Sequence, residues 1–97
     1  MTTEEETHLR LEQLAARLDQ AGKEDKDRAS HFAELAGFER WEAEKWPESS
    51  KQRMLLGQRA EELALTAVEW ADHAEWSARM AGKLRQRANV HRVKQGL

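Results

Sequence analysis

The chain has 97 residues and a net charge of −2; 39% of its residues are hydrophobic and 35% are charged, with five glycines and one proline. This composition excludes a sheet-rich fold and favours long helices. Cysteine is absent, which excludes disulfides, thiolate metal sites and a cysteine nucleophile. No apolar run approaches the roughly 20 residues that cross a bilayer, and the acidic start Met1–Glu6 is unlike a secretory leader. We therefore expect one all-α domain, residues 1–97, in the cytoplasm.

The first predicted helix is short and covers residues 3–20. Thr3 can cap it, and Glu6 follows three residues later, as in a capping box. Gly22 and the charged run after it are typical of a helix end followed by a solvated connection. The pattern therefore predicts a separate N-terminal helix.

Two longer helices are predicted over residues 25–46 and 47–92. Glu39 falls in the middle of the apolar side of the first of them. Because an unpaired buried carboxylate is costly, we expect Glu39 to pair with an arginine such as Arg59. Pro47 predicts the break between the two helices, since proline suits the first turn of a new helix and disfavours helical geometry in the residue before it. We expect the two long helices to pack antiparallel.

The last helix carries a heptad seam, in which residues recur in alternating steps of four and three. Its members are Leu56, Ala60, Leu63, Ala67, Trp70, Ala74, Ser77, Ala81, Leu84 and Ala88. Small residues predominate, which favours close packing against other helices. A preceding helix half as long covers only part of the seam, so the rest must meet either the N-terminal helix or another chain. We predict a helical bundle assembled as a homo-oligomer, with Leu63, Trp70, Ala74 and Ala81 at its interfaces.

A second stripe beside the seam mixes carboxylate, imidazole and indole side chains. It consists of Glu62, Thr66, Glu69, His73, Trp76 and Met80. Carboxylates and imidazoles that project inward build the di-metal sites of four-helix bundles, and Glu39, Glu62, Glu69 and His73 are the candidates for such a site here. The Glu-x-x-His order of those sites is missing, so we predict no metal and no cofactor. Glu69 and His73 are then expected to pair on the surface near a helical interface.

Four tryptophans stand against no tyrosine. Two of them, Trp41 and Trp76, lie off the apolar stripes. Each is either an anchor between subunits or a platform on which a nucleobase stacks. Trp76 suits stacking better, because His73 and Arg79 lie within about one turn of it and could meet a phosphate.

Basic residues form two groups. Arg53 and Arg59 lie near the start of the last helix, where free amides and the helix dipole favour anions, although a solvated surface explains them as well. After Glu75 the chain holds no acid but six Lys and Arg, whereas residues 1–27 hold eight acids against four Lys and Arg. The basic tail could bind nucleic acid or phosphate, complement the negative end of a long helix, or meet the acidic N-terminus of a neighbouring subunit.

The segment Pro47-Glu48-Ser49 opens a long helix, and Ala67-Val68-Glu69-Trp70-Ala71-Asp72 lies inside it. Over roughly Pro47 to Arg79 the chain resembles the anti-CBASS sponges, short phage proteins with a Pro-Asp/Glu-Ser start and an Ala-Val-x-Trp-Ala-Asn/Asp segment. The resemblance implies a short N-terminal helix and two long antiparallel helices in a compact oligomer. It also implies sequestration of cyclic oligonucleotide signals between protomers, without cleavage, in the cytoplasm of the host cell. The spacing from Pro47 to Trp70 is longer than in the family, and Thr7–Arg10 lacks its N-terminal ligand residues.

The leading hypothesis is a phage-type, immune-evasion homo-oligomer that sequesters a cyclic oligonucleotide or related small nucleotide. The residues expected to bind the ligand are Arg53, Arg59, His73, Trp76 and Arg79. The alternative is a protein–protein interaction module that uses the seam and exposed tryptophans such as Trp41. A ferritin-like metal bundle is third, and nucleic-acid binding by the basic tail is fourth. No Ser-His-Asp arrangement, glycine-rich phosphate loop or zinc motif is present, so we do not expect an enzyme.

Overall fold

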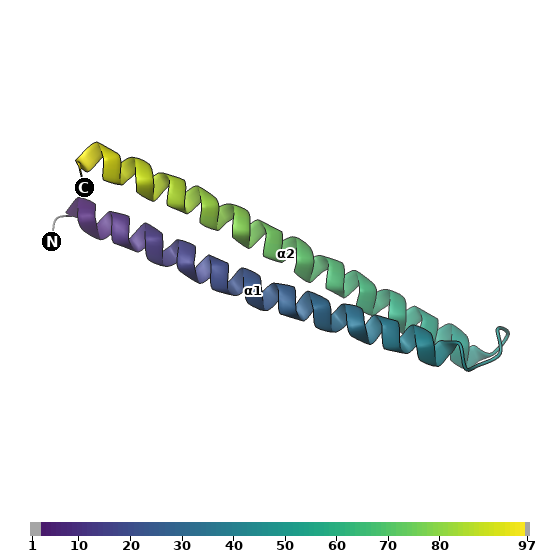
Figure 1. Ribbon diagram of the computed structural model, residues 1–97. Helices are drawn as coiled ribbons and strands as arrows, with labels where there is room; N and C mark the ends of the chain where they lie inside the picture. Colours follow the sequence, from purple (N-terminus) through teal and green to yellow (C-terminus); the bar gives the residue numbers. More distant parts are fainter. Residues whose placement is uncertain (1–2, 97) are drawn as a thin grey trace. The chain divides into compact units, whose positions relative to one another are not determined.

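The computed structural model describes residues 3–96 and is built from two long helices (Figure 1). Helix α1 spans Thr3–Ala43 and helix α2 spans Lys51–Gln95. No strand occurs among these residues. The prediction of an all-α chain is therefore confirmed. The prediction of a separate short N-terminal helix is wrong, because α1 combines the first two predicted helices.

Helix α1 continues through Gly22–Asp27, the stretch predicted to be a solvated connection. Its small or short residues recur at the spacing of the seam: Gly22 and Asp25 are buried and Ala29 is half-buried. Asp25 keeps only 3% exposure and forms an ion pair with Arg28, with 2.8 Å between Oδ1 and Nη1. The remaining charged residues of the run point to solvent. The charged run is therefore helical, and its buried positions continue the contact between the helices.

The break between the helices lies where Pro47 predicts it, but α2 begins four residues later. The Ser50 N–H donates to the Pro47 carbonyl at 2.9 Å, which places the proline in a turn before the helix. The Ser50 hydroxyl accepts a hydrogen bond from the Arg53 N–H at 3.1 Å. Ser50 is therefore the N-cap of α2, since a serine oxygen there satisfies a free amide of the first turn. At the other end, Gly96 has a positive φ of 70°, typical of a glycine that follows a helix.

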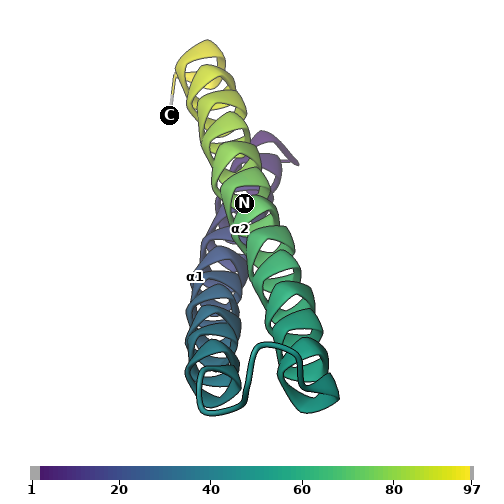
Figure 2. The same ribbon diagram turned by 90° about the vertical axis from the view of Figure 1, so that its right-hand side faces the viewer.

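The packing of the chain divides into two compact units. The first unit combines the part of α1 up to Glu24 with the part of α2 from His73 onward, and the second unit comprises Asp25–Asp72. In each unit a stretch of α1 runs antiparallel to a stretch of α2 (Figure 1). Figure 2 shows the irregular connection that joins the end of α1 to the start of α2 in the second unit.

Contacts between the helices define the pairing in each unit. In the first unit, Nδ1 of His8 lies 3.1 Å from the Ala88 carbonyl oxygen. In the second unit, Nη2 of Arg59 lies 3.3 Å from Oε1 of Glu39, so the predicted pairing of Glu39 with Arg59 is confirmed. The second half of the α2 seam therefore packs on α1 of the same chain. Of the two partners expected for it, the N-terminal helix and another chain, the structure shows the first, as the beginning of the single 41-residue helix α1.

The buried core consists almost entirely of alanine. In α2 the buried alanines recur every seventh residue, and in α1 they occupy three positions of a similar repeat. These residues are Ala60, Ala67, Ala74, Ala81 and Ala88 of α2 and Ala15, Ala36 and Ala43 of α1. The largest fully buried side chain is that of Ser77. The small alanine side chains let the two helices approach closely, while larger apolar residues stay partly exposed. Burial of alanine contributes little hydrophobic free energy, so this core stabilises the fold only weakly.

Replacement of Gly22 by alanine should stabilise the chain. A Cβ added there would lie 3.5 Å from the Ala74 carbonyl oxygen and 3.6 Å from Cβ of Ser77, which are ordinary contact distances. Removing a glycine from a helix interior is worth about 1 kcal/mol. Thermal unfolding followed by circular dichroism should therefore show a melting temperature raised by about 4–8 °C.

Gly82→Ala is the matched control, because a Cβ at Gly82 would meet nothing within 4 Å. It should stabilise by a similar amount through helix propensity alone. A Gly22→Ala variant that melts lower than the wild type, while Gly82→Ala melts higher, would show that the helices approach more closely at Gly22 than described.

Candidate functional site

The strongest candidate site lies on α2 in the first unit, where His73, Trp76 and Arg79 follow one another at three-residue spacing. The His73 and Trp76 rings are stacked, with centroids 5.8 Å apart and an interplanar angle of 30°. All three residues are exposed, and the Trp76 side chain keeps 48% of its accessible surface. The inner side of the helix is taken by buried seam residues such as Ala74 and Ser77. The three candidates therefore form an outward-facing cluster.

This cluster combines the two chemical features that a nucleotide ligand requires. An exposed indole offers a flat apolar face on which any nucleobase can stack. The Arg79 guanidinium is a planar donor suited to bidentate contact with a phosphate. Lys83 lies one turn beyond Arg79 and is also exposed. The local geometry can therefore hold a base and an anionic group side by side.

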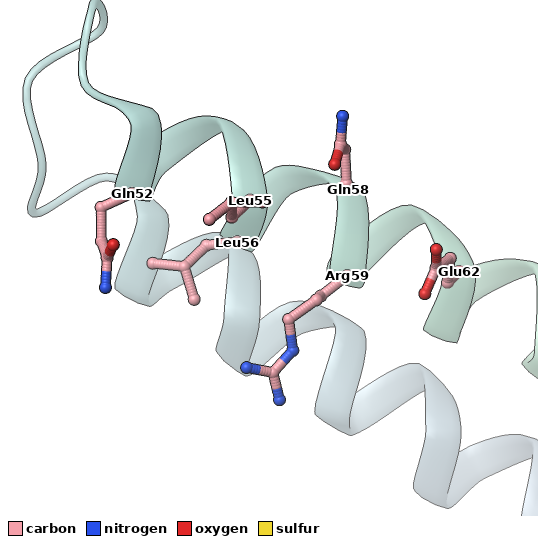
Figure 3. A pocket seen from close by; sticks show the side chains of 6 residues that line it. All are labelled: Gln52, Leu55, Leu56, Gln58, Arg59 and Glu62. Atoms are coloured by element: carbon pink, nitrogen blue, oxygen red, sulfur yellow. The ribbon is translucent and has the colours of Figure 1, made fainter.

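Arg53 and Arg59 belong to the second unit and are engaged in local contacts. The Arg53 guanidinium donates to the Trp46 carbonyl at 3.2 Å, which fixes the connection before α2. Arg59 pairs with Glu39. In Figure 3 the Arg59 side chain extends toward the neighbouring helix, whereas Gln58 points away from it. The structure thus groups three of the five predicted ligand residues in one unit and assigns these two to structural roles in the other.

Arg59 also lines a shallow hollow of about 260 Å³ on the first turns of α2 (Figure 3). Its other lining residues are Gln52, Leu55, Leu56, Gln58 and Glu62. Its charged residues are Glu62, whose carboxylate repels an anion, and Arg59, whose guanidinium is already paired with Glu39. An anion gains little there, so the hollow is a weak candidate for the predicted ligand.

The predicted interface residues fall into two groups. Ala74 and Ala81 are buried within the first unit, and the seam they occupy faces the chain's own α1. Leu63 and Trp70 of the second unit are half-buried. These four residues therefore serve packing within the chain.

Trp41, in contrast, keeps 54% of its accessible surface and lies outside the seam. Its ring centroid is 5.8 Å from that of Phe38. Nζ of Lys45 lies 3.6 Å from the ring centroid, a cation–π arrangement. One face of this indole is therefore occupied by Lys45, as the Trp76 ring is stacked on His73. Trp41 is followed three residues later by Glu44, whereas Trp76 is followed by Arg79, so Trp41 is the less suited of the two to an anionic ligand.

The basic tail is partly neutralised by the chain itself. Arg85 forms an ion pair with Asp19. The hydrogen bond from the Arg85 guanidinium lowers the pKa of the Asp19 carboxyl, and the same bond to the Asp19 carboxylate raises the pKa of Arg85. Arg92 donates to the Asn89 side chain at 2.9 Å. An acidic residue of the N-terminal segment and a basic residue of the tail thus meet within one chain, in the first unit.

A buried carboxylate that the sequence pattern did not indicate lies in the second unit. Asp25 pairs with Arg28, and the Arg28 guanidinium lies 5.0 Å from the ring centroid of Trp70. In the first unit, the Ser77 hydroxyl is buried without a hydrogen-bond partner among the described residues. The signal available in the sequence was the seven-residue repeat of small side chains, which continues through Gly22 and Ala29.

Residues 3–96 contain no group of three or more His, Cys, Asp or Glu side chains positioned to hold a metal ion. Neither helix, as far as the structure describes it, has a stretch that is long and apolar enough to cross a membrane. No family model, curated protein or solved structure matches the chain.

Loss of the Arg28 side chain should destabilise the chain more when Asp25 is present than when it is absent. Arg28→Ala removes a charged partner from a buried carboxylate, which costs about 1–3 kcal/mol. In the Asp25→Ala background, where alanine continues the seam, the same change should cost well under about 1 kcal/mol. Chemical unfolding of the two single variants and the double variant measures this coupling. Equal costs in both backgrounds would contradict it.

Asp19→Asn should lower the melting temperature near neutral pH, with a difference that vanishes in acid. The pKa of Asp19 is lowered from an ordinary 3.8 by Arg85. The stability from this pair is therefore present above that value and is lost as the pH falls through the lowered pKa. Melting curves at low salt, from neutral pH to about pH 2, should converge for the two proteins. A constant offset at all pH values would attribute the effect to packing instead of charge.

Proposed function

We propose that the protein assembles as a homo-oligomer that binds a cyclic oligonucleotide, or a related small nucleotide signal, and sequesters it without cleaving it. The observation that carries this proposal is the outward-facing cluster of His73, Trp76 and Arg79. The cluster presents a half-exposed indole and a guanidinium at adjacent turns of one helix. Sequestration, and a role in immune evasion, rest on the resemblance to the anti-CBASS sponges over Pro47–Arg79.

The distribution of charge supports this position for an anionic ligand. Residues 1–24 and 73–97 together hold nine Lys and Arg against seven acids, whereas residues 25–72 hold seven Lys and Arg against eleven acids. Trp76 lies in the net positive unit, just before the acid-free tail. Arg53 and Arg59 lie in the net negative unit. A net positive surface attracts an anion before it docks, and a net negative surface repels it. An anionic ligand is therefore drawn to the Trp76 cluster.

Self-assembly is supported by the composition of the buried core. Only alanines make up the buried hydrophobic residues of the described chain. Large apolar side chains remain exposed, among them Phe38, Leu65 and Val68. Chains of this size bury only about two-thirds of their unfolded surface, so they gain stability from further burial between subunits.

A second candidate function is a protein–protein interaction module. The observation in its favour is the exposed aromatic pair Phe38 and Trp41 in the second unit. Exposed tryptophans are frequent anchors of protein interfaces. Capture of one bacterial protein at a fixed stoichiometry, dependent on Trp41 and independent of Trp76, would favour this function.

The nucleotide proposal predicts that Trp76→Ala weakens ligand binding by about 5- to 150-fold, which corresponds to the loss of one stacked base. Isothermal titration of the wild type against a panel of cyclic di- and trinucleotides identifies the ligand and its affinity. Mass spectrometry of the recovered ligand should show it intact.

Trp41→Ala is the matched control, since Trp41 has a similar exposure but is followed three residues later by Glu44 and lies in the net negative unit. It should bind the ligand as the wild type does. Flat titrations across the panel would refute nucleotide binding. Equal losses in the two variants would refute the assignment to Trp76.

A further inference from the structure

A groove lined by small side chains runs between the two helices on one side of the second unit. One hollow of about 330 Å³ is lined by residues of both helices: Ala29, Ser30, Ala33, Ala67, Val68 and Ala71. A neighbouring hollow of about 360 Å³ is lined by Arg40, Glu61, Ala64, Leu65 and Val68. The two shallow hollows adjoin at Val68, which lines both, and together we call them the alanine groove.

The alanine groove carries its own aliphatic ridge. Leu65 and Val68 line it from α2 and keep 65% and 56% of their accessible surface. Beside them lie alanines, whose short side chains leave room for the side chains of another helix. A surface that offers both protruding aliphatic groups and a trough of small residues is complementary to itself. That property is what the shared patch of a two-fold symmetric dimer requires.

The charges of the alanine groove are self-complementary as well. Arg40 and Glu61 line the same hollow, one from each helix. Neither takes part in an ion pair among the described residues, in contrast to Glu39, Arg59 and Lys45 of the same unit. Two copies related by a two-fold axis can bring each arginine opposite the other copy's glutamate. A partner of unrelated sequence would have to supply a matching acid, base and trough.

We propose that the alanine groove is the face through which two copies of this chain pair. Leu65 and Val68 of each copy insert into the trough of the other, and Arg40 of each copy pairs with Glu61 of the other. The proposal rests on the self-assembly proposed above and names the surface responsible. It is independent of the nucleotide, whose cluster lies in the other unit.

The first test is the mass of the assembly, measured by light scattering after size-exclusion chromatography over a range of concentrations. Val68→Glu should weaken association at least about 100-fold, because it buries an unpaired carboxylate in the trough. Val90→Glu is the matched control, since Val90 has a similar exposure of 54% but lies in the first unit. It should assemble as the wild type does. Wild-type assembly by Val68→Glu would overturn the proposal.

The second test exchanges the charges and does not depend on how well a monomer folds. Arg40→Glu and Glu61→Arg should each weaken association about 10-fold, because each places like charges opposite one another. The double variant restores opposite charges and should associate as the wild type does. A double variant weaker than both single variants would overturn the proposal.

The outcomes separate this inference from the proposed function. A wild-type chain that stays monomeric at all concentrations overturns both self-assembly and the groove. An oligomer that persists in Val68→Glu and in both charge variants overturns the groove alone. Nucleotide titration of Val68→Glu adds an independent reading, because loss of pairing leaves the Trp76 cluster itself unaltered.

Discussion

The close contact of two helices through alanine is the constraint on which the rest of the structure depends. A residue with a methyl side chain at every seventh position lets the backbones approach, and any larger side chain in those positions would separate them. Each unit therefore accommodates its bulky apolar residues on the flanks of the seam or outside it. Half-buried Leu63 and exposed Leu65 are both consequences of the same packing. The exposed apolar surface is thus built into the fold.

A seam made of one repeating residue leaves the register of the helices poorly determined. Sliding one helix by seven residues would place alanine against alanine again. In the second unit, the pairing of Glu39 with Arg59 and the cation–π contact of Arg28 with Trp70 break this degeneracy, because a shifted register would separate these groups. In the first unit, the ion pair of Asp19 with Arg85 has the same effect. These polar positions therefore select one pairing among several of similar hydrophobic content.

The features that followed from the sequence are those governed by local spacing. Helical geometry alone predicts the all-helical class, the seven-residue alanine repeat and the proximity of His73, Trp76 and Arg79. The pairing of Glu39 followed from the free-energy cost of burying an unpaired carboxylate. Continuation of α1 through Gly22–Asp27 was missed, because a charged run has the same composition whether it lies in a loop or on a helix with one buried stripe. The N-cap at Ser50 was missed, because Pro47 favours a helix start equally well.

The roles of Arg53 and Arg59 were beyond sequence reasoning for a different reason. A basic residue near a helix N-terminus can bind an anion only if its side chain is not already paired with a group of the same chain. Whether it is paired depends on residues that are distant in the sequence. Arg53 is held by the Trp46 carbonyl, seven residues away, and Arg59 by Glu39 on the other helix. Arg79 forms no ion pair among the described residues and follows the exposed Trp76 by three residues on the same helix. Arginines that are bound within the chain stabilise the pairing of the helices, and only an arginine without such a partner, such as Arg79, is available to bind an anionic ligand.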